Sequence, residues 1–592
     1  MNFLERVQSL PTLGIGVSTE YGAGDAPGGL DIPALATEHP AWASFLEIGV
    51  EVAKGLDPHA EAWLRTGRPT THHFLDVNLD DPADFDPAWL DSLRALIARS
   101  RPAWLCGDAG LWHFGRRERG HMLLLPPILT DDAARAYGAG IARLRAATGL
   151  EVLPENPPGA VYVGNLHLLD AFARMCEAGD TGMLLDAAHL AIYQRMHGHD
   201  ALTGFDGFPL DRVVELHIAG ARIDQVDGYT FVEDDHTPAV LPETWEILSW
   251  VAARAPNLRA VVVECERNPL AHVGAIFAEV ERRVAGSAFD LRRRADRPIV
   301  GRMHPRVTTV EAAMGAPPMA AGPGSLAPAL RASPPRTAVQ RAVVRLLHVG
   351  RDGGVAPDVF TGALLDRIAA EGAVTDEERG WLRAVDPRAW RTDPWRAARL
   401  LAALLEEFPG ATAAHGKDML PFFRSARFDA CLRDGGSLAG AFAAWLIEVG
   451  TDDVAAHARV EGAVAELRRV VEAPASDAST GEGWTGSVLR VRSAHCRILT
   501  GRLAVPSGPD SHPPFELREA NLLVQAVGPD ADGSRRIVAS ELPEALARLL
   551  LDAAEPRPRG SLLADLRALG ADAGEDEDVL GELERDGLIV AV

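Results

Sequence analysis

The chain has 592 residues, of which 47% are apolar, as is typical of globular proteins. Its 59 Lys and Arg against 83 Asp and Glu leave a net charge of −24, which disfavours non-specific binding to nucleic acid. Five widely spaced cysteines without a CxxC pair disfavour a disulfide framework, and no apolar run approaches the ~20 residues of a membrane span. We therefore expect a cytoplasmic protein that binds neither nucleic acid nor membrane.

Residues 1–283 alternate short apolar runs with stretches that have helical spacing. This alternation predicts parallel strands joined by helices, and its eight units predict a (β/α)8 TIM barrel. A doubly wound open sheet is the alternative, but no GxGxxG follows the first strand. The predicted strands are 13–18, 45–51, 72–78, 103–108, 150–156, 181–189, 213–220 and 259–266. The predicted helices are 87–99, 131–148, 166–177, 242–254 and 270–284.

The composition changes after the predicted barrel, which we assign to residues 1–285. Residues 286–336 are predicted to be a Pro/Gly/Ala-rich linker, with six prolines between residues 315 and 336. Residues 337–475 have helical spacing and predict a mostly helical domain. Residues 476–592 predict a small α+β domain, whose final helix, helix and short strand resemble a winged helix.

Histidines and carboxylates gather at the carboxyl ends of the predicted strands, where the reacting groups of a (β/α)8 barrel lie. They are His72, His73, Asp108, Glu155, Asn156, Asp186, His189, His217, Asp234, Asp235, His236, Glu264 and Glu266. Burying so many charges at one rim is costly without a cation. Imidazole and carboxylate ligands favour iron, manganese or zinc, and several carboxylates suit bridging between ions.

Each of these residues alone also fits a structural role, as a core histidine, a helix cap or part of a solvated loop. Their shared position at one rim is what favours a metal site. His197 and His199, in the segment MHGHD, fit either role. We expect the remaining histidines between the strands to be structural, namely His39, His59, His167 and His272.

The first half resembles the multinuclear non-heme iron-dependent oxidases of the methanobactin-biosynthesis type. The matching segments are LGIGVS, FLEIGVE, HHFLDVNL, LEVLPENP, MLLDAAHLAIYQRMHGHD, VVELHIAGA, DDHTPAV and VVVECERN. The resemblance covers approximately residues 10–283. It implies a barrel that holds two or three iron ions in mixed valence and uses dioxygen to oxidise a cysteine in a ribosomally synthesised (RiPP) precursor peptide.

The resemblance also implies the metal ligands. They are His73, Glu155, Asp186, His217, Asp234, His236 and Glu264, with His189 where the family usually has Asn. Asp108, Asn156 and Glu266 are the candidates to support these ligands and the reaction. The family has Ser, an acid and His on strand four, whereas this chain has Gly107, Asp108 and Ala109. Ala109 removes one ligand, so either His72 or His113 substitutes or the site holds two ions.

Residues 337–592 resemble the separate partner protein that binds the precursor peptide, through the segment FPGATAAHGKDMLPFFRSARF. This resemblance implies a partner fused in cis, whose winged-helix-like end binds the peptide by strand addition. Two other interpretations remain open. The barrel is a divalent-metal sugar isomerase or epimerase, or it is a degenerate barrel that serves as a non-enzymatic scaffold.

Overall fold

The computed structural model divides the chain into two units, residues 1–400 and 401–592. The helices that follow the predicted linker are grouped with the barrel in the first unit. The structure describes residues 2–19, 29–52, 55–113, 124–226, 228–295, 338–349, 365–391, 401, 404–405, 407–416, 419–434, 437–468, 488–491, 496–506, 515–527, 536–572, 574–586 and 588–591. The Pro-rich segment 315–336 lies outside these ranges.

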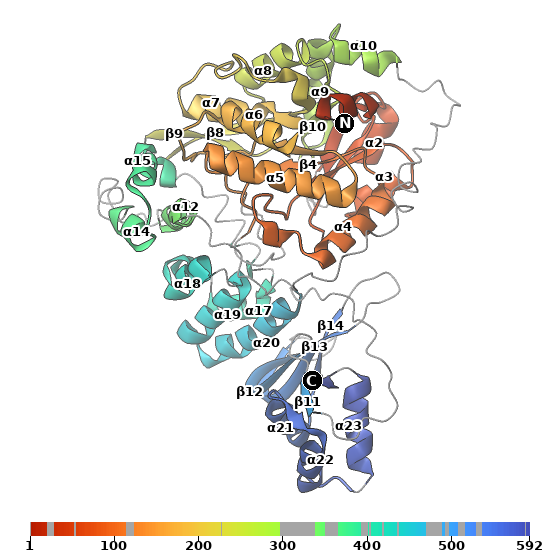
Figure 1. Cartoon of the computed structure of the whole chain (residues 1–592), viewed down its shortest axis with the longest axis vertical. Coiled ribbons are helices and arrows are strands. Elements are labelled where there is room, and N and C mark those ends of the chain that lie inside the picture. The colour runs from red at the N-terminus through yellow and green to blue at the C-terminus, as the bar shows by residue number, and fades with distance from the viewer. Residues whose placement is uncertain are drawn as a thin grey trace. The chain divides into compact units, whose positions relative to one another are not determined.

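Eight parallel strands close into a barrel in the order β1-β10-β7-β6-β5-β4-β3-β2 (Figure 1). They are β1 (Gly14–Thr19), β2 (Leu46–Val50), β3 (Thr70–Phe74), β4 (Leu105–Asp108), β5 (Val152–Glu155), β6 (Met183–Asp186), β7 (Val213–Ala219) and β10 (Ala260–Glu264). The predicted (β/α)8 barrel is therefore confirmed. A separate hairpin, β8 (Ala221–Val226) and β9 (Tyr229–Asp234), follows β7.

Helices surround the strands (Figure 1). They are α1 (Phe3–Arg6), α2 (Ile32–Glu38), α3 (Pro58–Leu64), α4 (Pro87–Ser100), α5 (Asp131–Thr148), α6 (Leu168–Gly179), α7 (Ala187–Met196), α8 (Pro242–Ala252), α9 (Leu270–Val284) and α10 (Ala288–Ala295). The five predicted helices all form. Phe289 of α10 is fully buried in the core between strands and helices.

Two strands differ from their predicted bounds by more than two residues at one end. β3 begins at Thr70 and ends at Phe74, which leaves residues 75–78 in the loop beyond it. The sixth predicted strand continued to His189, but β6 ends at Asp186. The Asp186 side chain caps α7 by accepting a hydrogen bond from the His189 backbone N–H at 2.5 Å, which starts the helix at once. His189 therefore lies in the first turn of α7.

The barrel has two apolar cores with a polar layer above one of them. Outward-facing strand residues pack against the helices, as expected for a parallel sheet covered by helices. Inside the barrel, a smaller core that includes Phe45, Trp104 and Leu153 closes the amino-terminal end together with Phe3 of α1. Polar side chains fill the barrel from there to the carboxyl ends of the strands, so the fold concentrates charge at one mouth.

The remaining elements are helical up to residue 468 and mixed beyond it. The helices are α12 (Ala338–Val349), α14 (Leu365–Glu371), α15 (Asp376–Ala384), α17 (Pro409–His415), α18 (Ala426–Asp434), α19 (Leu438–Val449) and α20 (Asp452–Arg468). An antiparallel sheet of β12 (Cys496–Pro506), β13 (Phe515–Val527) and β14 (Arg536–Glu541) packs against α20.

The chain ends in three helices and a second small sheet. The helices are α21 (Glu544–Asp552), α22 (Arg559–Ala568) and α23 (Glu575–Arg585), and the sheet has the order β15 (Arg557–Pro558), β11 (Val488–Val491), β16 (Ile589–Ala591). These elements follow the predicted order of helix, helix and short strand. Within the described ranges, no helix combines the length and apolarity that a bilayer crossing requires.

Candidate metal centre

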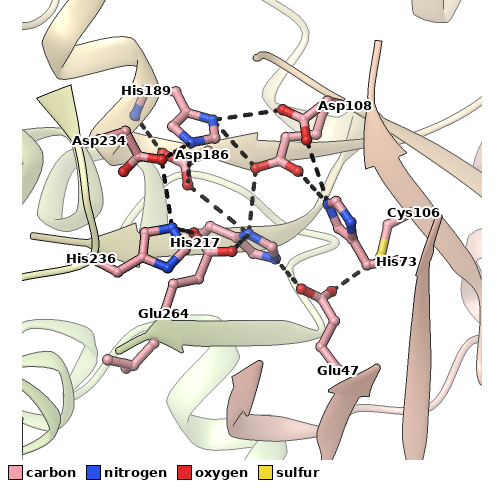
Figure 2. A network of polar contacts seen from close by, with 12 residues as sticks. Glu47, His73, Cys106, Asp108, Asp186, His189, His217, Asp234, His236 and Glu264 are labelled. Carbon is pink, nitrogen blue, oxygen red and sulfur yellow. Dashed lines mark hydrogen bonds and ion pairs between the residues drawn. The ribbon is translucent and has the colours of Figure 1, made fainter. Parts of the chain in front are cut away.

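Imidazoles and carboxylates from seven barrel strands, one helix and the β9 hairpin converge at the carboxyl mouth of the barrel, with Glu47 directly below it (Figure 2). They are Glu47, His73, Asp108, Glu155, Asp186, His189, His217, Asp234, His236 and Glu264. Their side chains are almost wholly buried, and the most accessible of them, Glu264, is 12% exposed. So many ionisable groups in a dry site require compensating positive charge.

Strand register explains why residues far apart in sequence meet here. Asp108 pairs with Glu155 across β4 and β5, and Asp186 pairs with His217 across β6 and β7. All four residues lie at or near the carboxyl ends of parallel strands, which share one rim of a closed barrel. The acids and histidines predicted at separate strand ends are therefore neighbours in space.

The hairpin β8–β9 supplies the ligands that no barrel strand provides. Asp234 ends β9, and His236 follows it with a φ of 55°, in the left-handed region. Gly220 joins β7 to the hairpin, and a Cβ at this position would overlap the carbonyl oxygen of Thr237. Glycine at residue 220 thus permits the close approach that brings the hairpin over the barrel mouth.

Two histidines have one nitrogen held by an outer acceptor. His189 Nδ1 donates to the Asn156 carbonyl oxygen at 2.8 Å, and His236 Nδ1 lies 2.8 Å from Glu266 Oε1. Their Nε2 atoms face Asp234 Oδ2, at 3.2 Å from His189 and 3.5 Å from His236. An outer acceptor that fixes the tautomer and leaves the second nitrogen free is typical of metal-binding histidines.

His217 has its outer contact through Nε2, whereas His189 and His236 have theirs through Nδ1. Its Nε2 lies 3.2 Å from Glu47 Oε1, below the mouth, and its Nδ1 faces Glu264 Oε1 at 3.3 Å and Glu155 Oε1 at 3.4 Å. His73 Nε2 lies 2.7 Å from Glu155 Oε2. Four imidazoles thus point a nitrogen into one ring of carboxylates, as Figure 2 shows for the labelled residues.

Three overlapping groups of donor atoms, whose members lie within 4.8 Å of one another, are His73–Asp108–Glu155, Glu155–Asp186–His217 and Asp186–His189–Glu264. A fourth group, Glu47–His217–Glu264, extends the cluster below the mouth. Glu155 and Asp186 each belong to two groups, so each carboxylate is placed to bridge two ions. The geometry therefore suits a cluster of ions better than a single ion.

Several buried atoms of this cluster have no hydrogen-bond partner in the described structure. They are Asp108 Oδ1, Glu155 Oε1, Asp186 Oδ2, His217 Nδ1 and Nε2, Asp234 Oδ1 and Glu264 Oε2. Native proteins satisfy most buried polar atoms, because an unpaired one costs roughly 1–3 kcal/mol. Cations bound among these atoms would satisfy them, and the mixture of imidazole and carboxylate fits iron, manganese or zinc.

The surrounding charges shift the pKa values of the metal-free cluster strongly. Burial alone would lower the pKa of His217, but the charges of Glu47, Glu264 and Glu155 outweigh it and raise this pKa well above its ordinary value. Burial, reinforced by Glu264 and Glu155, raises the pKa of Asp186 to about 7. Without metal, protons therefore supply the positive charge that ions would otherwise provide.

A cavity of about 500 Å³, part of it open to solvent, leads to the cluster. One wall is apolar and consists of Leu75, Trp112 and Leu124, which pack together. Ser18 lies on the cavity lining with a buried Oγ that has no partner in the described structure. The cavity thus offers an apolar wall and a hydroxyl group to a ligand that reaches the ions.

The structure brings together all eight predicted ligands and places the three supporting candidates beside them. Asn156 and Glu266 hold His189 and His236 from behind, whereas Asp108 lies among the donor atoms, 3.9 Å from His73 Nε2. These roles remain predictions. Glu47 was not predicted because it is the second residue of β2 and lies away from the carboxyl end of that strand, and the motif FLEIGVE was its only signal.

Three of the residues considered at the rim lie outside the cluster. His72 alternates with His73 along β3 and is buried on the opposite face, where burial and the charge of His73 lower its pKa to about 3. His113 Nε2 lies 2.8 Å from Asp84 Oδ2, and Asp235 pairs with Arg222. Neither His72 nor His113 replaces the ligand missing at Ala109; Asp108 is the strand-four residue that reaches the site.

Comparison with known proteins assigns the barrel region. Residues 31–285 match the family model described as "RiPP precursor modification enzyme MbnB/TglH/ChrH". A UPF0276 protein of Bordetella bronchiseptica is 29% identical over 259 residues, which cover 42% of this chain and 87% of that protein. A UPF0276 protein of Rhizobium meliloti is 25% identical over 235 residues, 38% of this chain and 73% of that protein.

Solved structures match the chain at lower sequence identity. An L-ribulose 3-epimerase has 14% identity and a TM-score of 0.28, and the match covers 49% of this chain and 99% of the epimerase. A xylose isomerase-like TIM barrel protein from Mycobacterium smegmatis, in complex with magnesium, has 13% identity and a TM-score of 0.30 over 47% of this chain and 99% of that protein.

Proposed function

Because residues 31–285 belong to the MbnB/TglH/ChrH family of RiPP precursor modification enzymes, we propose that the chain is an iron-dependent oxygenase acting on a precursor peptide. Its substrate group is a cysteine side chain. The observation that carries the proposal is the set of buried imidazole and carboxylate atoms without partners at the barrel mouth.

The proposed ligands are the three overlapping donor groups together with Asp234 and His236. Two or three ions fit this arrangement, since Glu155 and Asp186 are each shared by two groups. Asp108 takes the place of the histidine that Ala109 lacks, because it lies with His73 and Glu155 in one group. Bound iron in mixed valence would supply redox chemistry toward dioxygen.

The chain's own residues position the ions and the substrate. Asn156 and Glu266 fix the orientation of His189 and His236 by hydrogen bonds, and Glu47 lies beside His217, which keeps the donor atoms in place without substrate. The wall of Leu75, Trp112 and Leu124 covers part of the cavity and excludes water beside the reacting group.

The cysteine thiol must lose a proton before it can act as a ligand or a nucleophile. Asp108 Oδ1 is buried, has no partner in the described structure and faces the cavity, so it is placed to accept this proton. Burial and the charge of Glu155 hold the pKa of Asp108 well above its ordinary value in the metal-free protein. Bound cations would favour its ionised form, which can accept the proton.

The second half would bind the peptide in cis. In the sheet β12-β13-β14, each outer strand pairs with β13 alone among the described residues. An extended peptide can add to such an edge by main-chain hydrogen bonds, which suits a leader sequence that varies between substrates. The fused arrangement would raise the concentration of peptide near the barrel.

The test uses the full chain, loaded with iron under anaerobic conditions, and the Cys-containing peptide encoded by a short reading frame beside its gene. After exposure to dioxygen, mass spectrometry should show a mass change confined to the peptide fragment that holds the cysteine. The same peptide with Ser in place of Cys should stay unchanged, and His217→Ala enzyme should give no product. Activity on ketoses with Mg²⁺ or Mn²⁺, together with an unchanged peptide, would instead support the sugar isomerase interpretation.

A further inference from the structure

A second polar cluster lies inside the barrel, one layer below the mouth. Glu47 of β2, Cys106 of β4 and Glu215 of β7 each offer a donor atom, and these atoms lie within 4.8 Å of one another. Their exposed fractions are 1%, 0% and 0%. We propose that Glu47, Cys106 and Glu215 form a further metal site that takes a thiophilic divalent ion such as Zn²⁺ or Fe²⁺.

The contacts around the cluster leave one carboxylate oxygen available. Cys106 Sγ donates to Glu47 Oε2 at 3.1 Å, and Trp104 Nε1 donates to Glu215 Oε2 at 2.7 Å. The other oxygen of Glu215, Oε1, is buried and has no partner in the described structure. An unpaired carboxylate oxygen at this depth is costly, and a cation held between it and the thiol would satisfy it.

The donor set selects the kind of ion. Thiolate ligands favour Zn²⁺, Fe²⁺ or Co²⁺ over Mg²⁺ and Ca²⁺, which prefer oxygen alone. Typical bonds of roughly 2.3 Å to sulfur and roughly 2.0–2.2 Å to carboxylate oxygen keep the ligands of one ion within the spacing found here. Cys106 would bind as the thiolate, so each ion bound releases the thiol proton to solvent.

Position separates this site from the metal centre at the mouth. Cys106 pairs with His73 of β3 and precedes Asp108 by two residues, so its side chain lies one layer deeper than the Asp108 carboxylate. Glu47 links the two layers, because its Oε1 lies 3.2 Å from His217 Nε2 and its Oε2 accepts from Cys106 (Figure 2). The inference does not depend on the chemistry proposed for the mouth.

Cobalt provides a direct probe, since a thiolate bound to Co²⁺ gives a near-ultraviolet charge-transfer band that nitrogen and oxygen ligands do not give. The full chain, stripped of metal and titrated with Co²⁺ under anaerobic conditions, should develop this band. Cys106→Ser should abolish the band and bind one Co²⁺ fewer per chain. Cys176→Ser is the matched control, because Cys176 is equally buried but lies on α6, where it donates to the Gly182 carbonyl oxygen; it should keep the band.

Two further variants distinguish loss of this site from misfolding and from loss of metal at the barrel mouth. Glu215→Gln keeps the thiol and should also lose the band, and its far-ultraviolet circular dichroism reports whether the barrel remains folded. His217→Ala should weaken binding at the mouth while the band persists. A wild-type chain without the band at saturating Co²⁺, or an unchanged band in folded Glu215→Gln, would overturn the inference and leave Cys106 as a protonated thiol hydrogen-bonded to Glu47.

Discussion

At the scale of single residues, three histidines at the barrel mouth each lie between two acceptor groups. His189, His236 and His217 each have one nitrogen next to an outer acceptor and the other among carboxylates. A protonated histidine between two acceptors has the same arrangement, because both of its nitrogens donate. The stronger argument for ions is therefore the set of buried donor atoms that have no hydrogen-bond partner in the described structure.

Replacing His217 should remove metal without unfolding the barrel. His217→Ala takes away a donor nitrogen that faces Glu155 and Glu264, so we expect metal affinity to fall at least 10- to 100-fold and turnover to become undetectable. The control is His272→Ala, because His272 is exposed on α9. Elemental analysis after gel filtration measures the metal, and equal contents in the two variants would contradict the proposed site.

The metal-free protein should lose stability as pH rises, and metal should restore it. Burial and nearby acids raise the folded pKa of Asp186 to about 7 from 3.8, so between about pH 4 and 7 the folded state binds more protons than the unfolded state. The free energy of unfolding therefore decreases across this range through Asp186. Ions must displace the same proton, so their affinity should rise about tenfold per pH unit for this group until pH 7.

Thermal melts at pH 5, 6, 7 and 8, with and without bound metal, test this pH dependence. The gap in melting temperature between metal-loaded and metal-free protein should widen as pH rises. His217 acts in the same direction, since its raised pKa contributes stability that is lost when the imidazole becomes neutral at higher pH. A gap that stays constant or narrows would show that these groups are not the ones that bind metal.

At the scale of elements, two junctions place ligands with little freedom. Asp186 ends β6 and caps α7, so the same residue closes a strand, starts a helix and keeps Oδ2 for the centre. The hairpin β8–β9 is a two-stranded sheet outside the barrel, and a pair of strands alone is only marginally stable. Its position over the mouth therefore depends on the tight packing next to Gly220.

Gly220→Ala should disturb the metal centre from a distance. The added methyl group would overlap the Thr237 carbonyl oxygen, so the segment that carries Asp234 and His236 must move. Overpacking of this kind costs about 1–3 kcal/mol, and we expect metal content to fall with the barrel still folded. Chemical denaturation and elemental analysis measure the two effects.

Gly274→Ala is the matched control for this change. Gly274 lies within α9, and only Trp42 approaches its added Cβ, at 3.8 Å. Alanine is favoured over glycine inside a helix by about 0.5–1 kcal/mol, so this variant should be slightly more stable and keep its metal. Similar metal loss in both variants would point to a general loss of packing and not to the hairpin.

At the scale of the whole molecule, the chain combines a barrel with a second unit that has cores of its own. Residues 401–592 contain one core between α20 and the sheet β12-β13-β14 and another around α21, α22 and α23. A unit with its own cores can fold and bind independently of its neighbour. The fused-partner proposal requires such a unit, but it also assigns α12, α14 and α15 to the partner, whereas these helices group with the barrel.

Limited trypsin digestion should separate metal binding by the barrel from peptide binding by the carboxyl-terminal fragment. The Pro/Gly/Ala-rich sequence 315–336 contains Arg331 and Arg336, and segments of this composition are favoured cleavage sites. We expect the amino-terminal fragment to keep its metal but to lose most activity at low peptide concentration, because tethering no longer concentrates the peptide. Calorimetric titration should show peptide binding by the carboxyl-terminal fragment. Tight binding by the barrel fragment alone would refute the fused-partner proposal.

The linear chain was sufficient to predict the barrel and most of its mouth. Apolar runs alternating with helical spacing predict eight parallel strands, and parallel strands of one barrel must end at a common rim. Residues as distant as His73 and Glu264 could therefore be assigned to one site, and the family resemblance added the expectation of iron. Predicting the ligands required only the positions of the strand ends and not the side-chain geometry.

Side-chain layers and ring orientations became apparent only in the folded chain. Glu47, Cys106 and Glu215 lie in the middle of their strands, and alternation along a strand indicates which face a residue occupies but not the stagger between neighbouring strands. The predicted strand through His189 was wrong because the cap by Asp186 starts α7 earlier. Which residues share a layer, and which nitrogen of each histidine faces the ions, depends on how the barrel closes, because closure sets the stagger that brings distant side chains to one height.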